Sequence, residues 1–283
     1  MKELFNCGKK SGINVYAFVL AVLLTLMGIA NAQEAPMFDK DYKAKTDDLW
    51  FIISPYAMLA SQATDVGTTQ LRQSFGDLSS LTNFGFQLAG SVIYKNWFLS
   101  ADGTYANLGT NKASGPLTVN LNIRQYILDL RLGYLLLNRD DYRKKAKFLN
   151  GWYLELNAGA KSWRNDVTLD YSITLNDPPP LIEDQIKNNQ YWWDPMIGVK
   201  GRVFLNQSVM LGINAGYGGF GIGSASKYTW DFLFSNTFKV SKLILITTGF
   251  RAFKYKRSDP GDEGEIETKV TVAGPVLGMS FIL

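Results

Sequence analysis

The stretch Tyr191–Tyr217, YWWDPMIGVKGRVFLNQSVMLGINAGY, consists of two alternating segments joined by a turn. The first segment has apolar residues at one parity and charged residues at the other: Trp193, Ile197, Val199, Val203 and Leu205 against Asp194, Lys200 and Arg202. The second repeats the apolar parity, with Val209, Leu211, Ile213, Ala215 and Tyr217 against Gly212, Asn214 and Gly216. A period of two indicates strands, and a three-residue turn at 206–208 keeps both apolar sets on one face. Apolar residues outside and small or polar residues inside are typical of an outer-membrane β-barrel.

The same alternation recurs along the chain and predicts an all-β fold, a transmembrane antiparallel up-and-down barrel of about ten strands, with eight or twelve as alternatives. The predicted strands are 49–62, 83–95, 97–108, 117–137, 152–173, 191–205, 209–217, 228–238, 243–255 and 266–283. An even number of strands places both termini on the periplasmic side. The connections expected on the outer side are long loops at 63–82, 109–116, 174–189 and 257–265.

Two further expectations concern single residues in this barrel. Pro195 cannot donate a hydrogen bond to a strand ladder, and a closed barrel has no free edge, so a β-bulge is predicted there. Aromatic residues should border the two membrane interfaces. Those predicted for the outer rim are Tyr105, Trp163, Trp192, Trp193, Tyr217 and Tyr228.

The N-terminal residues 1–32 have the features of a secretory signal peptide that is cleaved after Ala32. Lysines precede an apolar run from Val15 to Ile29, and small residues follow it. Residues 33–48 are then a polar periplasmic lead-in, and 49–283 form the barrel. The single cysteine, Cys7, lies within the predicted signal, so no disulfide is expected.

Charge and composition exclude several functions. The chain has 29 basic and 25 acidic residues, and removal of the signal's three lysines and one glutamate leaves 26 and 24, a net charge of +2. This balance argues against nucleic-acid binding. The chain has no histidine, the commonest general base near neutral pH, so the sequence predicts that the protein is not an enzyme and has neither a metal site nor a cofactor. The glycines at 219–223 resemble a dinucleotide fingerprint, but no βαβ unit surrounds them.

The inward parity contains five acidic and five basic residues, and these form the candidate site. They are Asp102, Asp129, Arg131, Glu155, Lys161, Asp194, Lys200, Arg202, Asp231 and Arg251. Because unpaired charge inside a narrow barrel is costly, we expect a salt-bridge network that fills the lumen, with a structural or binding role for the protein. The alternative is a narrow, porin-like channel for a solute or ion, in which these charges select what passes. A barrel of this size favours the filled lumen.

The expected partners are those of any outer-membrane barrel: the membrane lipids, lipopolysaccharide and the barrel insertion machinery. The basic run 139–147 is a solvated turn or a docking site for a periplasmic partner. We expect a monomer.

Several short motifs along the chain occur together in one group of proteins. They are Ser54-Pro55-Tyr56, Trp193-Asp194-Pro195-Met196-Ile197-Gly198, Gly218 to Ser224 and Gly274-Pro275-Val276-Leu277-Gly278. With these motifs the chain resembles a family of uncharacterised bacterial outer-membrane β-barrel proteins. The resemblance implies the barrel fold and the outer-membrane location, and it implies no activity.

Overall fold

The computed structural model describes residues 49–67, 69–114, 117–138, 151–173, 182–206, 208–241, 243–261 and 264–283. All of them belong to the compact unit Glu34–Leu283. The predicted signal peptide, the lead-in 33–48 and the basic run 139–147 lie outside the described residues. In the part that is described, no helix has both the length and the apolar character needed to span a bilayer.

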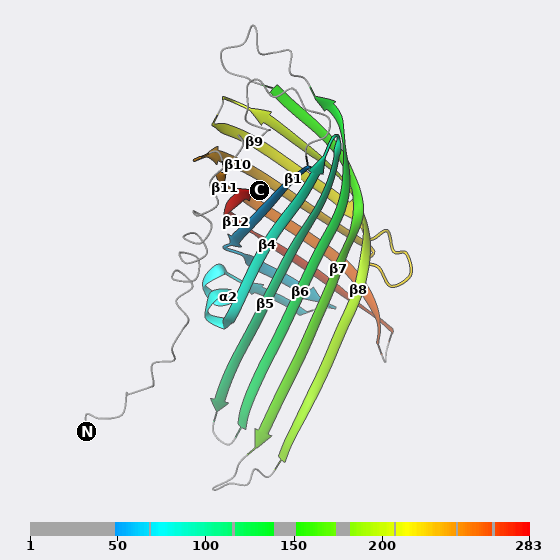
Figure 1. Ribbon diagram of the computed structural model, residues 1–283. Coiled ribbons are helices and arrows are strands. Elements are labelled where there is room, and N and C mark those ends of the chain that lie inside the picture. The colour runs from blue at the N-terminus through cyan, green and yellow to red at the C-terminus, as the bar shows by residue number, and fades with distance from the viewer. Residues whose placement is uncertain are drawn as a thin grey trace, which may run out of the picture. The chain divides into compact units, whose positions relative to one another are not determined.

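Ten antiparallel strands close into a barrel, because the last strand, β12, pairs back with the first, β1 (Figure 1). The predicted all-β antiparallel barrel of ten strands is therefore confirmed. Its strands follow the chain order: β1 (Leu49–Met58), β4 (Thr82–Tyr94), β5 (Trp97–Ser114), β6 (Leu117–Asn138), β7 (Gly151–Ile173), β8 (Ile182–Phe204), β9 (Val209–Gly218), β10 (Tyr228–Lys239), β11 (Ile244–Gly261) and β12 (Gly264–Ile282).

The predicted loop 63–82 is wrong, since most of it is regular structure. β2 (Ser61–Val66) pairs with β12 beyond the point where β1 leaves it, and β3 (Thr69–Gln73) forms a hairpin with β2. Helix α2 (Phe75–Leu81) leads back to the barrel. The polar composition of this segment resembles a loop, but β12 is longer than β1 and offers it unpaired backbone groups.

Helix α2 is short, has no buried residue and is held by a capping box. The Ser74 N–H donates to the Asp77 carboxylate at 2.8 Å, and the Asp77 N–H donates to the Ser74 hydroxyl oxygen at 3.3 Å. The Ser74 hydroxyl, which donates to the Asp77 carboxylate at 2.7 Å, and the Ser74 N–H hold the pKa of Asp77 below its ordinary value. The cap therefore defines the start of a helix that has no core of its own.

The outward faces of the strands form an apolar belt. Its exposed members include Phe51, Leu88, Leu99, Leu130, Leu156, Ile197, Ile213, Phe250 and Leu277. Exposed apolar surface of this extent is unusual in water, but it is the expected surface of a barrel surrounded by lipid.

The two ends of the barrel differ. Both Leu49 and Ile282 lie at the end of the barrel where β4 joins β5 and β8 joins β9, which we call the turn end; the other is the loop end. Three loops predicted at the loop end are shorter than expected, because β5 reaches Ser114, β8 begins at Ile182 and β11 reaches Gly261. Polar residues there continue the strands beyond the belt instead of forming loops.

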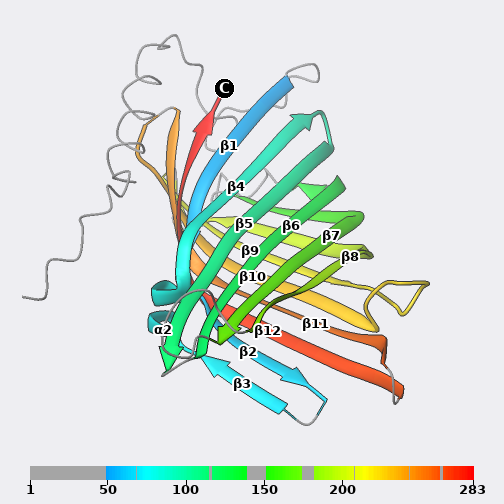
Figure 2. The same cartoon turned by 90° about the horizontal axis from the view of Figure 1, so that it is seen from below.

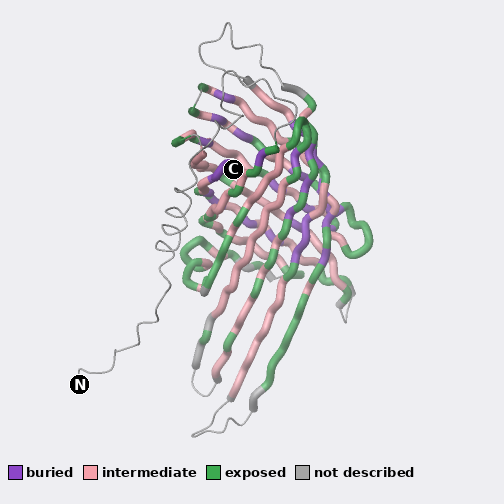
Figure 3. Tube along the Cα trace, in the orientation of Figure 1, coloured by how far each residue is buried: buried purple, intermediate pink, exposed green. Residues whose placement is uncertain are grey.

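The wall is uneven at the loop end. β9 ends at Gly218, opposite Met196, and β10 begins at Tyr228. β8 nevertheless continues back to Ile182 and, among the described residues, pairs there with β7 alone, so residues 182–194 have an open edge on their other side. Figures 1 and 2 show β5 to β8 running past the turn between β9 and β10, and Figure 3 shows this part of β8 exposed.

The uneven wall explains Pro195. The β7–β8 register passes through the pair Ala160 and Pro195 without a shift, so the predicted bulge is wrong. The carbonyl oxygen of Pro195 accepts a hydrogen bond from the Gly219 N–H at 3.0 Å, so the nitrogen of Pro195 also faces the side where β9 ends. Because that side of β8 becomes an open edge, no donor is required there.

Candidate functional site: charges across the barrel interior

The centre of the lumen contains a compact cluster of two acids and two bases. Arg131 on β6 donates to Asp129 through Nε and through Nη2, each at 2.7 Å, and Nη2 also reaches Asp231 on β10. The Lys161 ammonium on β7 lies 3.0 Å from Asp231 and 3.3 Å from Asp129. All four side chains are buried, so each charge has opposite charges as its direct neighbours.

Two glycines make room for the Arg131 guanidinium. A Cβ atom at Gly216 would overlap its Nη1 atom, and one at Gly198 would lie 2.8 Å from Nη1 and 2.6 Å from the Asn157 side-chain oxygen. The Arg131 Nη1 atom itself donates to Asn157 at 3.3 Å. The glycines on β8 and β9 thus leave room for the guanidinium of Arg131 to pack closely against these strands while it reaches across the lumen.

Two smaller groups adjoin the centre. Arg251 on β11 lies 3.1 Å from Asp102 on β5, and the Tyr56 hydroxyl donates to Asp102 at 2.7 Å while it accepts from Arg251. Lys200 on β8 lies 3.3 Å from Glu155 on β7. Together with the central cluster, these contacts involve eight of the ten predicted residues.

Among the described residues, the other two predicted residues form no ion pair. Asp194 is fully buried and accepts hydrogen bonds from the Trp163 indole at 2.9 Å and from Ser226, so it anchors the turn after β9. The Arg202 guanidinium lies over the Phe98 ring, with its carbon 6.0 Å from the ring centroid. The expected five-against-five pairing is therefore incomplete: Asp194 accepts from neutral donors, and Arg202 lies over an aromatic ring.

Apolar side chains lie on both sides of the charges. At the turn end the strand ends contribute a buried cluster of Trp50, Phe204, Met210, Leu245 and Ile282. Toward the loop end a second cluster consists of Trp163, Trp192, Tyr255, Val270 and Val272. Arg257 stacks on Trp192, with 4.4 Å between guanidinium carbon and ring centroid. The lumen is thus crossed by an apolar layer, a charged layer and an aromatic layer.

Sequence reasoning missed several members of this site, although the signal was present. Trp163 and Trp192 were expected in the outer aromatic girdle, but they are 2% and 1% exposed and point inward. Trp163 shares its parity with Lys161, and Trp192 shares its parity with Asp194, so the alternation itself places both inside. The role of Tyr56 could not be found in this way, because the first strand has no clear alternation.

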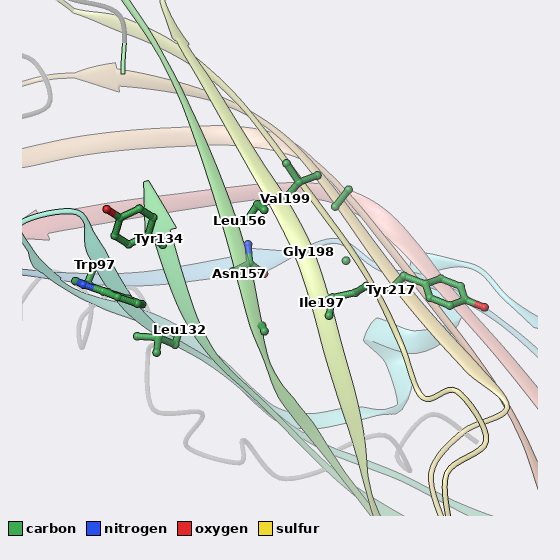
Figure 4. Close-up of a pocket in the computed structure, with 12 residues that line it drawn as sticks. Trp97, Leu132, Tyr134, Leu156, Asn157, Ile197, Gly198, Val199 and Tyr217 are labelled. Carbon is green, nitrogen blue, oxygen red and sulfur yellow. The ribbon is translucent and has the colours of Figure 1, made fainter. Parts of the chain in front are cut away.

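The described residues contain no group of three acidic or cysteine side chains arranged to hold a metal ion. The outer wall has an open depression in the apolar belt, lined by residues of β5 to β9 (Figure 4). There the small side chains of Ala158 and Ala215 lie among Leu156, Ile197 and Tyr217. The depression faces away from the charge network and belongs to the lipid-facing surface.

The match to one solved outer-membrane barrel, that of OmpT, supports the fold. No family model and no curated protein matches the chain. Among solved structures, the outer membrane protease OmpT from Escherichia coli is similar with a TM-score of 0.53 and 10% identity, over 87% of this chain and all of that one. Ail of Yersinia pestis is also matched, with a TM-score of 0.34, 8% identity and coverage of 84% of this chain and 99% of that one. The neisserial surface protein NspA gives 0.30 and 7%, covering 83% and 99%. The fold is that of bacterial outer-membrane β-barrel proteins.

The similarity to OmpT corrects one prediction. The sequence predicts that the protein is not an enzyme, whereas the structure with a TM-score of 0.53 is that of a protease. This finding overturns the prediction, because a barrel of the same fold supports catalysis. At 10% identity the likeness concerns the fold and transfers no catalytic residue.

Proposed function

We propose that this protein is an outer-membrane barrel with a closed lumen and a binding role carried by its loop end. Its turn end, where the first and last described residues lie, faces the periplasm after the signal peptide is removed. The observation that carries this proposal is the sequence of three layers across the lumen. Each layer is buried, and the charged one is held by direct ion pairs, so an ion would have to break these pairs to pass.

The alternative function, a narrow channel, is favoured by one observation. The side-chain oxygens of Gln87 and Asn214 are buried, and no described residue forms a hydrogen bond with them. Buried polar atoms of this kind are usually satisfied by water, so part of the lumen is wet. We prefer the closed-lumen proposal because the apolar layer and the aromatic layer close the lumen at the two ends of any such wet region.

Single-channel conductance of the refolded chain in planar bilayers tests the proposal. Wild type should be silent, while Asp231→Ala and Arg251→Ala should open measurable steps because each removes a charge that holds the network together. Glu267→Ala is the matched control, since Glu267 pairs with Lys256 on the outside of the wall and its loss should leave the bilayer silent. A wild type that conducts with an ion preference altered by the first two substitutions would favour the channel instead.

A further inference from the structure

We propose that the open edge of β8, residues 182–194, binds an extended polypeptide segment of another protein as an additional antiparallel strand. This inference rests on the proposed binding role and assigns that role a surface and a class of partner. A strand with an open edge presents a row of backbone donors and acceptors, and addition of a strand is a recurring mode of peptide recognition.

The register shows which backbone groups are available. In a strand the N–H and C=O of one residue point to the same side, and those of the next residue point to the other. The Pro195 carbonyl oxygen faces the end of β9, so the odd-numbered residues of β8 direct their backbone toward the open edge. Across the described chain, no backbone partner pairs with Asn189, Tyr191 or Trp193 on that side.

The usable stretch has a defined beginning and end. At its far end the Gln185 N–H already donates to the Asp184 carboxylate at 2.7 Å. At the near end Pro195 lacks an N–H and the ladder with β9 begins at Met196. Between these limits, residues 187–193 form an edge of seven residues in which Lys187 is the only charged side chain. Exposed strand edges are usually protected from pairing with other chains by several charges, a proline or a bulge. Residues 187–193 contain no proline and no bulge, and only one charge, that of Lys187.

The side chains beside this edge indicate the partner. Tyr191 and Trp193 are 57% and 39% exposed on the outward face, and their rings meet edge to face at 6.2 Å. Such a pair is suited to an aromatic or β-branched residue on a neighbouring strand. The opposite face has the amides of Asn188 and Gln190. The fitting segment therefore alternates β-branched or aromatic residues with polar ones.

A second copy of this chain fits less well. Two copies in one membrane have the same orientation, so their β8 edges could meet only as parallel strands, which pair less stably than antiparallel ones. A segment from a different protein can approach in the antiparallel direction. The geometry therefore favours a separate, extended polypeptide over self-association.

The test uses a fluorescent peptide of about eight residues that alternates valine and threonine, and it measures anisotropy with the full refolded chain in detergent micelles. Asn189→Pro removes an edge N–H that β7 does not use, whereas Asn189→Ala removes the same side chain and keeps that N–H. We expect wild type and Asn189→Ala to bind alike, and Asn189→Pro to bind at least about tenfold more weakly. The peptide methylated at its central backbone nitrogens should not bind.

The proposal is overturned if wild type shows no binding up to about 1 mM peptide, or if Asn189→Pro binds as well as Asn189→Ala. It is also overturned if wild type is a dimer that Asn189→Pro converts to a monomer, because the edge is then occupied by a second copy. Failure of the underlying proposal looks different. A barrel that conducts but binds the peptide contradicts the closed lumen alone, and a silent barrel without peptide binding contradicts the edge alone.

Discussion

The Asp194 carboxylate accepts two hydrogen bonds from Ser226, from its N–H at 2.7 Å and from its hydroxyl at 2.9 Å, across 32 residues of chain. The Trp192 indole donates to the same hydroxyl oxygen at 3.0 Å. Both Asp194 and Ser226 are fully buried. One carboxylate thus joins the turn after β9 to the aromatic layer of the lumen.

Asp194→Ala should destabilise the barrel strongly. The substitution leaves the Trp163 indole and both Ser226 donors buried without an acceptor, so the free energy of unfolding should fall by about 3 kcal/mol or more. Urea titration of the refolded protein in micelles measures the loss. Asp166→Ala is the control, because its ion pair with Arg164 is largely exposed and should be worth at most about 1 kcal/mol. Equal losses in the two variants would contradict the anchoring role of Asp194.

Gly216→Ala tests the space beneath Arg131. The new methyl group would overlap the guanidinium and push it away from Asp231, at a cost of about 1–3 kcal/mol in the free energy of unfolding. Gly201→Ala is a matched control on the neighbouring strand, since a Cβ there meets nothing within 4 Å. The denaturation midpoints of both variants should be compared with wild type. If Gly216→Ala is as stable as Gly201→Ala, Arg131 does not depend on this close approach.

The cap of α2 should make local stability depend on pH. The pKa of Asp77 is lowered in the folded state, chiefly by its hydrogen bonds with Ser74, so the cap's contribution is present above the ordinary carboxyl pKa. It should be lost as pH falls through the depressed pKa of the folded state. The protection factor of the Leu78 amide, which donates to the Ser74 carbonyl oxygen at 3.0 Å, reports this change. Asp77→Asn should remove the pH dependence, and a variant that keeps it would show that another group is responsible.

The alternation of side chains was sufficient to predict the ten strands of the barrel, but it predicted neither β2 and β3 nor the ion pairs across the lumen. Parity places Lys161 inside, and the register sets it opposite Asp129 on β6 and opposite Asp194 on β8. Its ammonium pairs with Asp129 and, across the lumen, with Asp231, while Asp194 accepts hydrogen bonds from neutral donors. Which charged side chains meet across the lumen depends on the tilt of the strands and on the diameter of the barrel. Neither can be read from the alternation of residues along a single strand.

The limits of the local pattern are also visible at Pro195 and Ser226. The bulge at Pro195 was predicted on the assumption that β8 is paired on both sides along its whole length. The pairing of β8 with β9 ends at Gly218, and Pro195 lies directly beyond the last pair. Ser226 lies in a glycine-rich turn where small polar residues are ordinary. Ser226 is buried because it donates to the carboxylate of Asp194, 32 positions earlier in the chain. Nothing in the sequence of the turn itself predicts this contact.

The contact of Arg251 with Tyr56 and Asp102 also has a consequence for assembly. The central cluster joins β6, β7 and β10, which are connected through consecutive neighbours, so it can form in a sheet that is still open. Arg251 meets Tyr56 only across the seam between β1 and β12, whose pairing unites the two ends of the described chain. This contact can therefore form only after β1 has paired with β12. It stabilises the closed barrel and does not stabilise any intermediate in which the barrel is still open.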